Sequence, residues 1–278
     1  MNSSTLINGL PGEHLPIGDR ALQYGDGLFE TISCLAGEPR WLERHLQRLR
    51  EGCRRLQIPF DAQPALGAEV RQLAQGHARC IVKVIVSRGV ATRRGYRPSG
   101  EERTTRIVSR HEWPQEGAGQ AGREPALQVG VSGVALGVNP RLAGMKHLNR
   151  LEQVLAQLER PAGLDEVLML ATSGEVISGS MSNLFLVDAQ GLFTPPVDRC
   201  GVAGVMRGLI LDQLAAASQQ SAPAWVRPAL PAALVQVREA FLTNVRWGIR
   251  SIGVLDGRAL PSDDWAQRLR RSLDAGGG

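Results

Sequence analysis

In residues 141–155, RLAGMKHLNRLEQVL, a lysine lies between a glycine and a run of apolar residues at helical spacing. Gly144 stands two residues before Lys146, and the apolar residues that follow recur at helical spacing. These apolar residues are Leu148, Leu151, Val154, Leu155 and Leu158. The pattern predicts a helix that begins near Lys146. Its amine then lies at the junction of an extended segment and a helix, where a ligand can approach.

Lysine is rare in this chain. Of the 32 basic residues only Lys83 and Lys146 are lysines, so 32 − 2 = 30 are arginines. Arginine therefore supplies the general surface charge, and a remaining lysine can mark a task that a guanidinium cannot perform. The main task of this kind is a primary amine that loses its proton and attacks a carbonyl. Composition alone does not choose between the two lysines.

The rest of the chain is typical of two domains of unequal size, because a single core stops growing near 278 residues. We predict a smaller N-terminal α/β domain over residues 1–112, with a strand, helix, strand order. A polar linker rich in Gly and Pro follows over residues 113–125, and a strand-rich C-terminal domain covers residues 126–278. The linker contains GAGQAG at residues 117–122, which neither follows a strand nor opens a helix and so fails the context of a dinucleotide-binding loop.

Several function classes fit the composition poorly. The net charge is +5, but the arginines form no tail or stripe and only 4% of residues are aromatic, which argues against nucleic-acid binding. No apolar run is long enough to span a membrane, and no signal peptide is visible, so we expect a cytoplasmic protein. The five histidines and four cysteines show no metal-ligand spacing; we expect no metal site and reduced thiols.

Blocks along nearly the whole chain resemble the class-IV, branched-chain-aminotransferase-like family of pyridoxal-phosphate enzymes. They are YGDGLFETI at residues 24–32, HLQRL at 45–49, AGMKHLNRLEQVL at 143–155, NLF at 183–185, LFT at 192–194 and VAGVMR at 202–207. The block around Lys146 resembles that of bacterial aminodeoxychorismate lyases. The resemblance implies a fold-type-IV α/β (α+β) architecture with a barrel-like C-terminal domain, pyridoxal 5'-phosphate as cofactor, and a homodimer. The activity it implies is the conversion of 4-amino-4-deoxychorismate to 4-aminobenzoate and pyruvate.

The resemblance also implies roles for single residues. Lys146 binds the cofactor covalently and acts as the acid–base group, and Arg48 grips the cofactor phosphate with its forked donors. The backbone N–H groups of Val205 and Met206 meet the same phosphate at a helix N-terminus. Asn244 falls where relatives place a hydroxyl residue against the phosphate.

Contacts with the substrate are expected from another group of residues. Tyr24 matches an active-site aromatic residue of the family. Because the substrate carries two carboxylates, arginines of the segment SRGVATRRGYRP are candidates to bind it. These are Arg88, Arg94 and Arg97.

One position departs from the family pattern. In relatives, a glutamate five residues before the asparagine of the NLF block hydrogen-bonds the pyridine nitrogen. The asparagine is Asn183 here, and the position of the glutamate is Ser178. A serine cannot supply the charge that makes the cofactor a strong electron sink. We expect a transaminase to suffer more from this loss than a lyase whose product is aromatic. A D-amino-acid or branched-chain aminotransferase on the same fold remains the alternative, and an arginine-rich nucleic-acid-binding protein is a more distant one.

Overall fold

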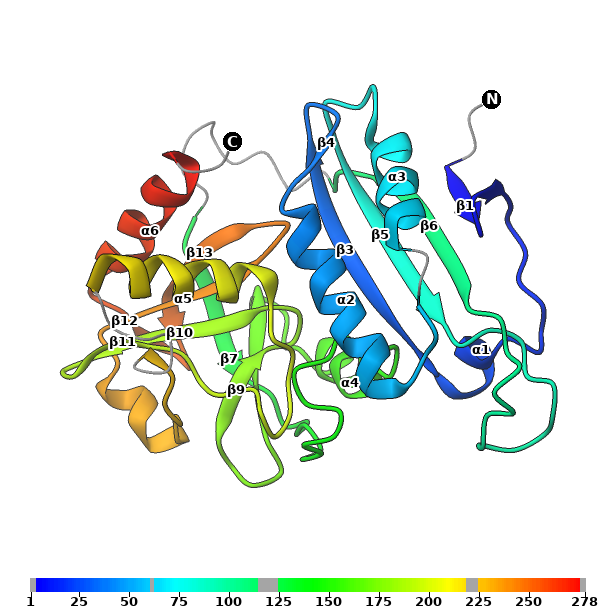
Figure 1. The fold of residues 1–278 in the computed structure, drawn as a ribbon. Helices are drawn as coiled ribbons and strands as arrows, with labels where there is room; N and C mark the ends of the chain where they lie inside the picture. The colour runs from blue at the N-terminus through cyan, green and yellow to red at the C-terminus, as the bar shows by residue number, and fades with distance from the viewer. Residues whose placement is uncertain (1–3, 61–62, 115–124, 219–224, 276–278) are drawn as a thin grey trace. The chain divides into compact units, whose positions relative to one another are not determined.

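The computed structural model describes residues 4–60, 63–114, 125–218 and 225–275 of the chain (Figure 1). Two compact units are present: residues 1–115 together with 145–149, and residues 116–144 together with 150–278. The sequence predicts that residues 145–149 belong to the C-terminal domain, 126–278. They belong to the first unit instead, because their backbone hydrogen-bonds to a strand of that unit. The predicted linker over residues 113–125, with its GAGQAG sequence, lies almost entirely outside the described residues.

The first unit is built on a six-stranded antiparallel sheet in the order β2-β1-β6-β5-β3-β4. Its long central strands pair in continuous register, from Gly27 opposite Ser87 to Leu35 opposite Arg79. The elements are β1 (Thr5–Ile7), β2 (Leu10–Pro11), α1 (Arg20–Tyr24), β3 (Gly27–Leu35), β4 (Glu38–Pro39), α2 (Leu42–Leu56), α3 (Gln63–Ala74), β5 (Arg79–Ser87) and β6 (Thr105–Glu112).

Helices α2 and α3 cover one face of this sheet (Figure 1). The apolar stripe of α2 is buried, and it includes Leu46, Leu49 and Cys53. Gly52 brings α2 close to β3, since a Cβ at this position would lie 2.8 Å from a methyl group of Leu28. Burial of this stripe therefore fixes the position of α2 on the sheet.

The second unit contains a closed barrel of six strands. Strands β13, β7, β8, β9, β10 and β12 pair in a ring that closes where Asn183 of β10 faces Ser178 of β9. Strands β11 and β14 extend the sheet outside this ring. The elements are β7 (Leu127–Val131), α4 (Leu151–Leu158), β8 (Glu166–Leu170), β9 (Val176–Gly179), β10 (Asn183–Asp188), β11 (Gly191–Phe193), α5 (Val205–Ser218), η2 (Pro231–Gln236), β12 (Glu239–Asn244), β13 (Gly248–Leu255), β14 (Arg258–Ala259) and α6 (Asp264–Ala275).

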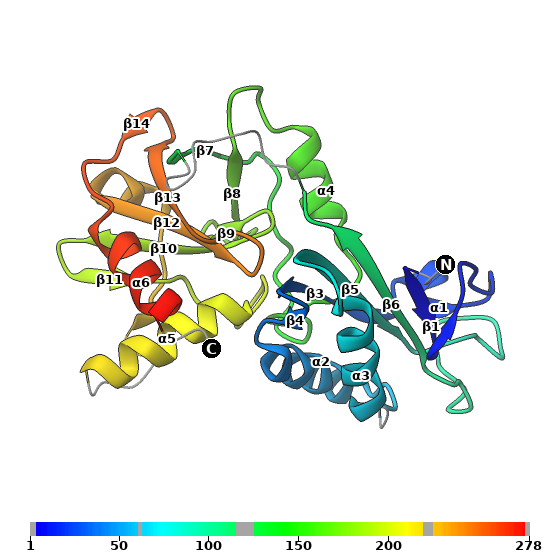
Figure 2. The ribbon, with the colours of Figure 1, turned by 90° about the horizontal axis from the view of Figure 1, so that it is seen from above.

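Alternation along the strands fills the barrel and covers its outside. Leu184 and Leu186 of β10 belong to a core that draws side chains from all six strands of the ring. Phe185 and Val187 point the opposite way and pack with residues of α5 and α6. Figure 2 shows these two helices along the same side of the barrel. The period-two pattern thus produces an apolar barrel interior and a second apolar layer beneath the helices.

The predicted mixed α/β architecture with a barrel-like second domain is confirmed. The helix start expected at Val205 and Met206 is also present. The helix predicted to begin near Lys146 begins only at Leu151. Among the described residues no helix is both long enough and apolar enough to span a bilayer.

Candidate active site

Lys146 lies on a short extended segment that pairs with the beginning of β3. The N–H of Phe29 donates to the Lys146 carbonyl (2.9 Å), and the N–H of Leu148 donates to the Gly27 carbonyl (3.0 Å). These bonds make Leu28 and His147 antiparallel partners. Because the Lys146 carbonyl and the Leu148 N–H both pair with β3, this segment is held in an extended conformation, and α4 therefore starts later than the leucine spacing predicts.

The two lysines of the chain face the same aromatic ring. The Nζ atom of Lys146 lies 4.3 Å from the centre of the Phe29 ring, and that of Lys83 lies 5.6 Å from it. Lys83 is opposite Thr31 in the sheet, two residues from Phe29 along β3. Two ammonium groups are therefore placed on the sheet face opposite α2, one at its edge and one within it. No sequence pattern indicates that Lys83 and Lys146 are neighbours, since they lie far apart along the chain.

Arg48 of α2 is held by a buried carboxylate. Its Nε donates to Oε1 of Glu30 (2.7 Å) and its Nη2 to Oε2 (2.5 Å), a paired arrangement that fixes the guanidinium plane. The Nδ1 atom of His45 lies 2.6 Å from the same Oε2. Sequence reasoning found Arg48 but missed Glu30. The signal for it was an acidic residue at a core position of a β-strand, which requires a partner from another element.

The charges of this cluster follow from its burial. Burial alone would raise the pKa of Glu30, but the positive charge of Arg48, together with the hydrogen bonds that Glu30 accepts, outweighs burial and lowers that pKa to about 2. Burial lowers the pKa of His45, and this effect exceeds the opposing attraction of Glu30. Near neutral pH the cluster therefore contains an ionised carboxylate, a guanidinium and a neutral imidazole.

Val205 and Met206 form the first turn of α5, which contains no acidic residue. The turn is fixed by Asn183, whose Nδ2 donates to the Val202 carbonyl (2.8 Å). Gly204, the residue before the helix, has no room for a side chain, because a Cβ there would collide with Oδ1 of Asn183. Asn183 therefore supports the start of α5, and the helix dipole at this end favours an anion.

Ser178 and Asn244 are engaged by the protein backbone. The Ser178 hydroxyl donates to the Gly179 carbonyl (2.9 Å). Oδ1 of Asn244 accepts from the N–H groups of Arg246 and Trp247 (3.0 and 2.9 Å), which closes the turn between β12 and β13. Both side chains thus stabilise strand ends, and their contacts with a cofactor remain predictions.

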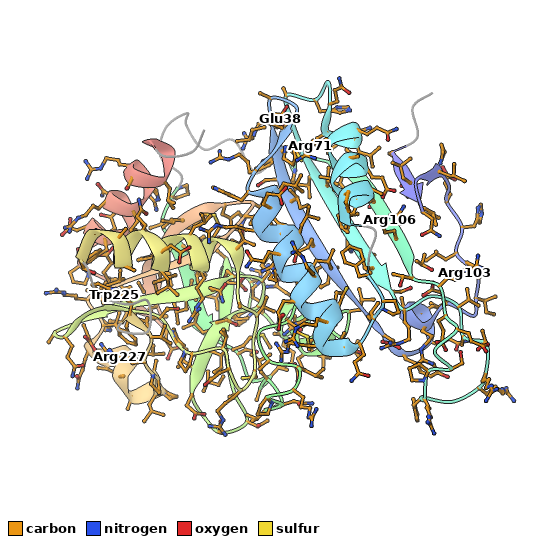
Figure 3. The ribbon with its side chains drawn as sticks, viewed as in Figure 1. Glu38, Arg71, Arg103, Arg106, Trp225 and Arg227 are labelled. Atoms are coloured by element: carbon orange, nitrogen blue, oxygen red, sulfur yellow. The ribbon has the colours of Figure 1, made fainter. Side chains whose placement is uncertain are left out.

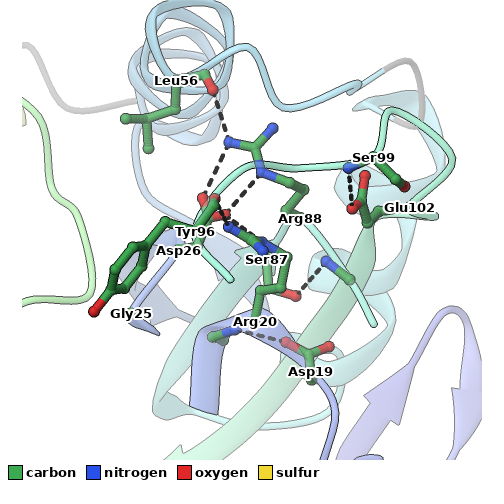
Figure 4. Close-up of polar contacts among 12 residues, drawn as sticks. Asp19, Arg20, Gly25, Asp26, Leu56, Ser87, Arg88, Tyr96, Ser99 and Glu102 are labelled. Carbon is green, nitrogen blue, oxygen red and sulfur yellow. Dashed lines mark hydrogen bonds and ion pairs between the residues drawn. The ribbon is translucent and has the colours of Figure 1, made fainter. Parts of the chain in front are cut away.

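Arg88 is a structural residue of the first unit. It donates four hydrogen bonds, two to the carboxylate of Asp26 and one each to the carbonyls of Leu56 and Gln57. Figure 4 shows Arg88 with Asp26 and Leu56. Asp26 also accepts from Nε of Arg20 (2.7 Å). Burial would raise the pKa of Asp26, but its bonds to Arg88 and Arg20 lower it. Through these bonds Arg88, at the end of β5, connects that strand to the end of α2 and to the residue before β3.

The other predicted substrate residues lie around the loop after Arg88. The Tyr24 ring packs edge-on against Tyr96 of that loop, with a centroid distance of 5.4 Å. Arg20 holds the loop by donating to the carbonyls of Gly95 and Tyr96 (3.3 and 2.7 Å). Arg94 and Arg97 are exposed on the same loop.

The residues present fit a cofactor that carries an aldehyde and a phosphate. The first unit supplies the amine of Lys146 and the fixed guanidinium of Arg48. The second unit, taken by itself, supplies the start of α5, where Gly204 leaves no room for a side chain and the helix dipole favours an anion. Within the described ranges no cluster of three metal-binding side chains occurs. The four cysteines are buried free thiols.

Comparison with known proteins gives consistent matches. The family model described as amino-transferase class IV matches residues 27–255. The aminodeoxychorismate lyase of Vibrio harveyi is 38% identical over 214 residues, which cover 75% of this chain and 76% of that protein. The crystal structure of 4-amino-4-deoxychorismate lyase from Pseudomonas aeruginosa is 39% identical, with a TM-score of 0.88 and 98% of both chains covered. A crystal structure of a branched-chain amino acid aminotransferase with pyridoxamine 5'-phosphate shares the fold, with 22% identity, a TM-score of 0.81 and coverage of 99% of this chain and 94% of that one.

Acidification should destabilise the protein through the Glu30 cluster in two steps. The pKa of His45 is lower in the folded chain than its ordinary 6.5, so the unfolded chain gains the proton first and stability falls as the pH drops below 6.5. The pKa of Glu30 is about 2 instead of 4.5, so its contribution is present above 4.5 and is lost as the pH falls from 4.5 towards 2.

Urea unfolding of the wild type and of His45→Asn at a series of pH values measures the first step. We expect the variant to lose stability less steeply than the wild type between pH 6.5 and 4.5. Equal slopes in this interval would show that His45 is not held neutral.

Proposed function

Since the chain belongs to the class IV aminotransferase family, we propose that it is a 4-amino-4-deoxychorismate lyase that forms 4-aminobenzoate and pyruvate with pyridoxal 5'-phosphate. The observation that carries this proposal is the identity of 38–39% with two aminodeoxychorismate lyases, one of them matched over 98% of both chains. The branched-chain aminotransferase structure matches the fold at 22% identity. The difference in identity favours the lyase over the aminotransferase alternative.

We propose that Lys146 binds the cofactor and that Arg48 and the backbone N–H groups of Val205 and Met206 bind its phosphate. Asn244 and Ser178 are proposed neighbours of the same cofactor. When bound, pyridoxal phosphate supplies an electron sink next to the amino-bearing carbon of the substrate. The amine of Lys146 must be neutral to accept a proton.

The reaction then needs a single proton to be moved. Lys146 removes the proton from C4 of the substrate ring, the bond between C3 and the enolpyruvyl oxygen breaks, and the ring becomes aromatic. The electron pair of the broken bond leaves with the oxygen, and the proton passes to the CH2 carbon of the released enolate to give pyruvate, so atoms and charges balance. The substrate carries two carboxylates, and the exposed guanidinium groups of Arg94 and Arg97, on the loop that packs against Tyr24, are the proposed groups that attract it.

Replacement of Lys146 tests the function. We expect Lys146→Ala to lower the formation of 4-aminobenzoate from 4-amino-4-deoxychorismate by roughly a thousandfold, because both covalent binding and proton transfer are lost. The assay measures 4-aminobenzoate and pyruvate, which the wild type should release in equal amounts. Rapid glutamate formation from amino acids and 2-oxoglutarate, without 4-aminobenzoate, would refute the lyase and favour the aminotransferase.

A second prediction concerns Ser178, at the position where the family has glutamate. We expect Ser178→Glu to raise the rate of amino-group transfer to 2-oxoglutarate, because the added carboxylate would strengthen the electron sink of the bound cofactor. Ser178→Gln is the matched control, with the same length and no charge. The idea fails if both variants transfer amino groups equally fast.

We also propose that the protein acts in the cytoplasm.

We propose in addition that two copies of the chain associate through α4. Leu151, Val154, Leu155 and Leu158 form an exposed apolar stripe on this helix, with Leu151 and Leu158 exposed by 77% and 75%. Apolar side chains at such spacing on one face of a helix are suited to pack against a partner surface. A second copy is the partner that a homo-oligomer needs, and a symmetric dimer is the commonest form.

The dimer is tested by the mass of the protein in solution. We expect the wild type to sediment as two chains of 30.0 kDa. The double variant Leu151→Glu, Leu158→Glu should sediment as one chain, because two charges from each copy would be buried without partners. Val235→Glu, at an exposed apolar position off the stripe, should leave the dimer intact. A double variant that stays dimeric would place the interface elsewhere.

A further inference from the structure

Glu30 is the most heavily bonded buried group near the proposed phosphate ligand Arg48. Its side chain is almost fully buried, and it points from β3 into the interface with α2. It accepts from Nε and Nη2 of Arg48 and from Nδ1 of His45, all within 2.7 Å. Such a pair holds an arginine in one rotamer, since two parallel hydrogen bonds define the plane of the guanidinium.

His45 contributes one hydrogen bond and no charge. A carboxylate can only accept, so the proton shared with Glu30 belongs to Nδ1 of His45, and Nε2 carries a lone pair. That Nε2 atom is buried and has no hydrogen-bond partner in the part of the chain that the structure describes. An apolar residue would avoid this cost if packing were the only need. His45 can therefore hold Glu30 by a hydrogen bond without adding a second positive charge beside that of Arg48.

A carboxylate beside Arg48 is unfavourable for anion binding on charge alone. Glu30 stays ionised, since its pKa is lowered, and it cancels much of the attraction that Arg48 exerts on a phosphate. What Glu30 gives in return is orientation of a long and flexible side chain.

We propose that Glu30, steadied by His45, is a positioning residue that sets the guanidinium of Arg48 for the cofactor phosphate. This inference rests on the proposed function, in which Arg48 is the phosphate ligand. It predicts that Glu30 matters for a cofactor with a phosphate and not for the same aldehyde without one.

The first unit offers a matched control. Glu69 of α3 is also buried and is held by Arg106 of β6 in the same paired way, with Nη2 to Oε1 at 2.6 Å and Nε to Oε2 at 3.0 Å. Figure 3 labels Arg106 on β6. The two carboxylates thus have the same chemistry and similar burial, but Glu69 pairs with an arginine that has no proposed ligand.

The experiment compares the binding of pyridoxal 5'-phosphate and of pyridoxal to the full-length apoprotein by absorbance titration. We expect Glu30→Gln to weaken the binding of pyridoxal 5'-phosphate on the order of tenfold, the loss of about one charge-assisted hydrogen bond. Pyridoxal binding should not change. Glu69→Gln should change neither affinity, although both variants should unfold at lower temperature than the wild type.

Other outcomes distinguish a failure of the positioning role of Glu30 from a failure of the proposed function. Equal weakening of both ligands, or binding of pyridoxal 5'-phosphate that is unchanged or tighter in Glu30→Gln, would overturn the positioning role. A wild type that binds neither ligand would refute the proposed function itself. If Glu30→Gln does not fold, Glu30→Asp keeps the charge but shortens the side chain, and it should show the same phosphate-selective loss to a smaller degree. In an Arg48→Lys background, Glu30→Gln should add no further selective loss.

Discussion

The backbone hydrogen bonds between residues 145–149 and β3 are the constraint on which the candidate site depends. They hold Lys146 at the edge of the first sheet with its ammonium over the Phe29 ring. Just upstream, Gly144 pairs with Val202, on the loop that leads to α5. Lys146 therefore follows by two residues Gly144, whose backbone is paired with this loop. An amine that must reach one carbon atom repeatedly benefits from a backbone held in this way.

Buried charge in the first unit follows one rule. Glu30, Glu69 and Asp26 each accept paired hydrogen bonds from an arginine. Arginine suits these sites because its fork matches a carboxylate and it stays protonated. Arginine thus has a structural role at these three sites, and the two lysines of the chain lie instead over one aromatic ring, that of Phe29.

Local patterns predicted most of the fold and part of the site. The apolar spacing of α2 and the continuous apolar run of β10 are local, so the elements could be located. Lys146 emerged from lysine scarcity and from the family resemblance. The start of α4 was placed too early, because the pairing of Leu148 with Gly27 depends on a strand far away in the sequence. The roles of Glu30 and Arg88 depend on contacts between α2, β3 and β5, which no local pattern contains.

The central claim is that the amine of Lys146 forms the covalent bond with pyridoxal 5'-phosphate. The most direct measurement is reduction of the yellow protein with borohydride, followed by digestion and mass mapping of the labelled peptide. With only two lysines in the chain, the result has few possible interpretations. The account predicts a single phosphopyridoxyl label on the peptide that contains Lys146. A label on Lys83, or a protein that takes up no label at all, would contradict it.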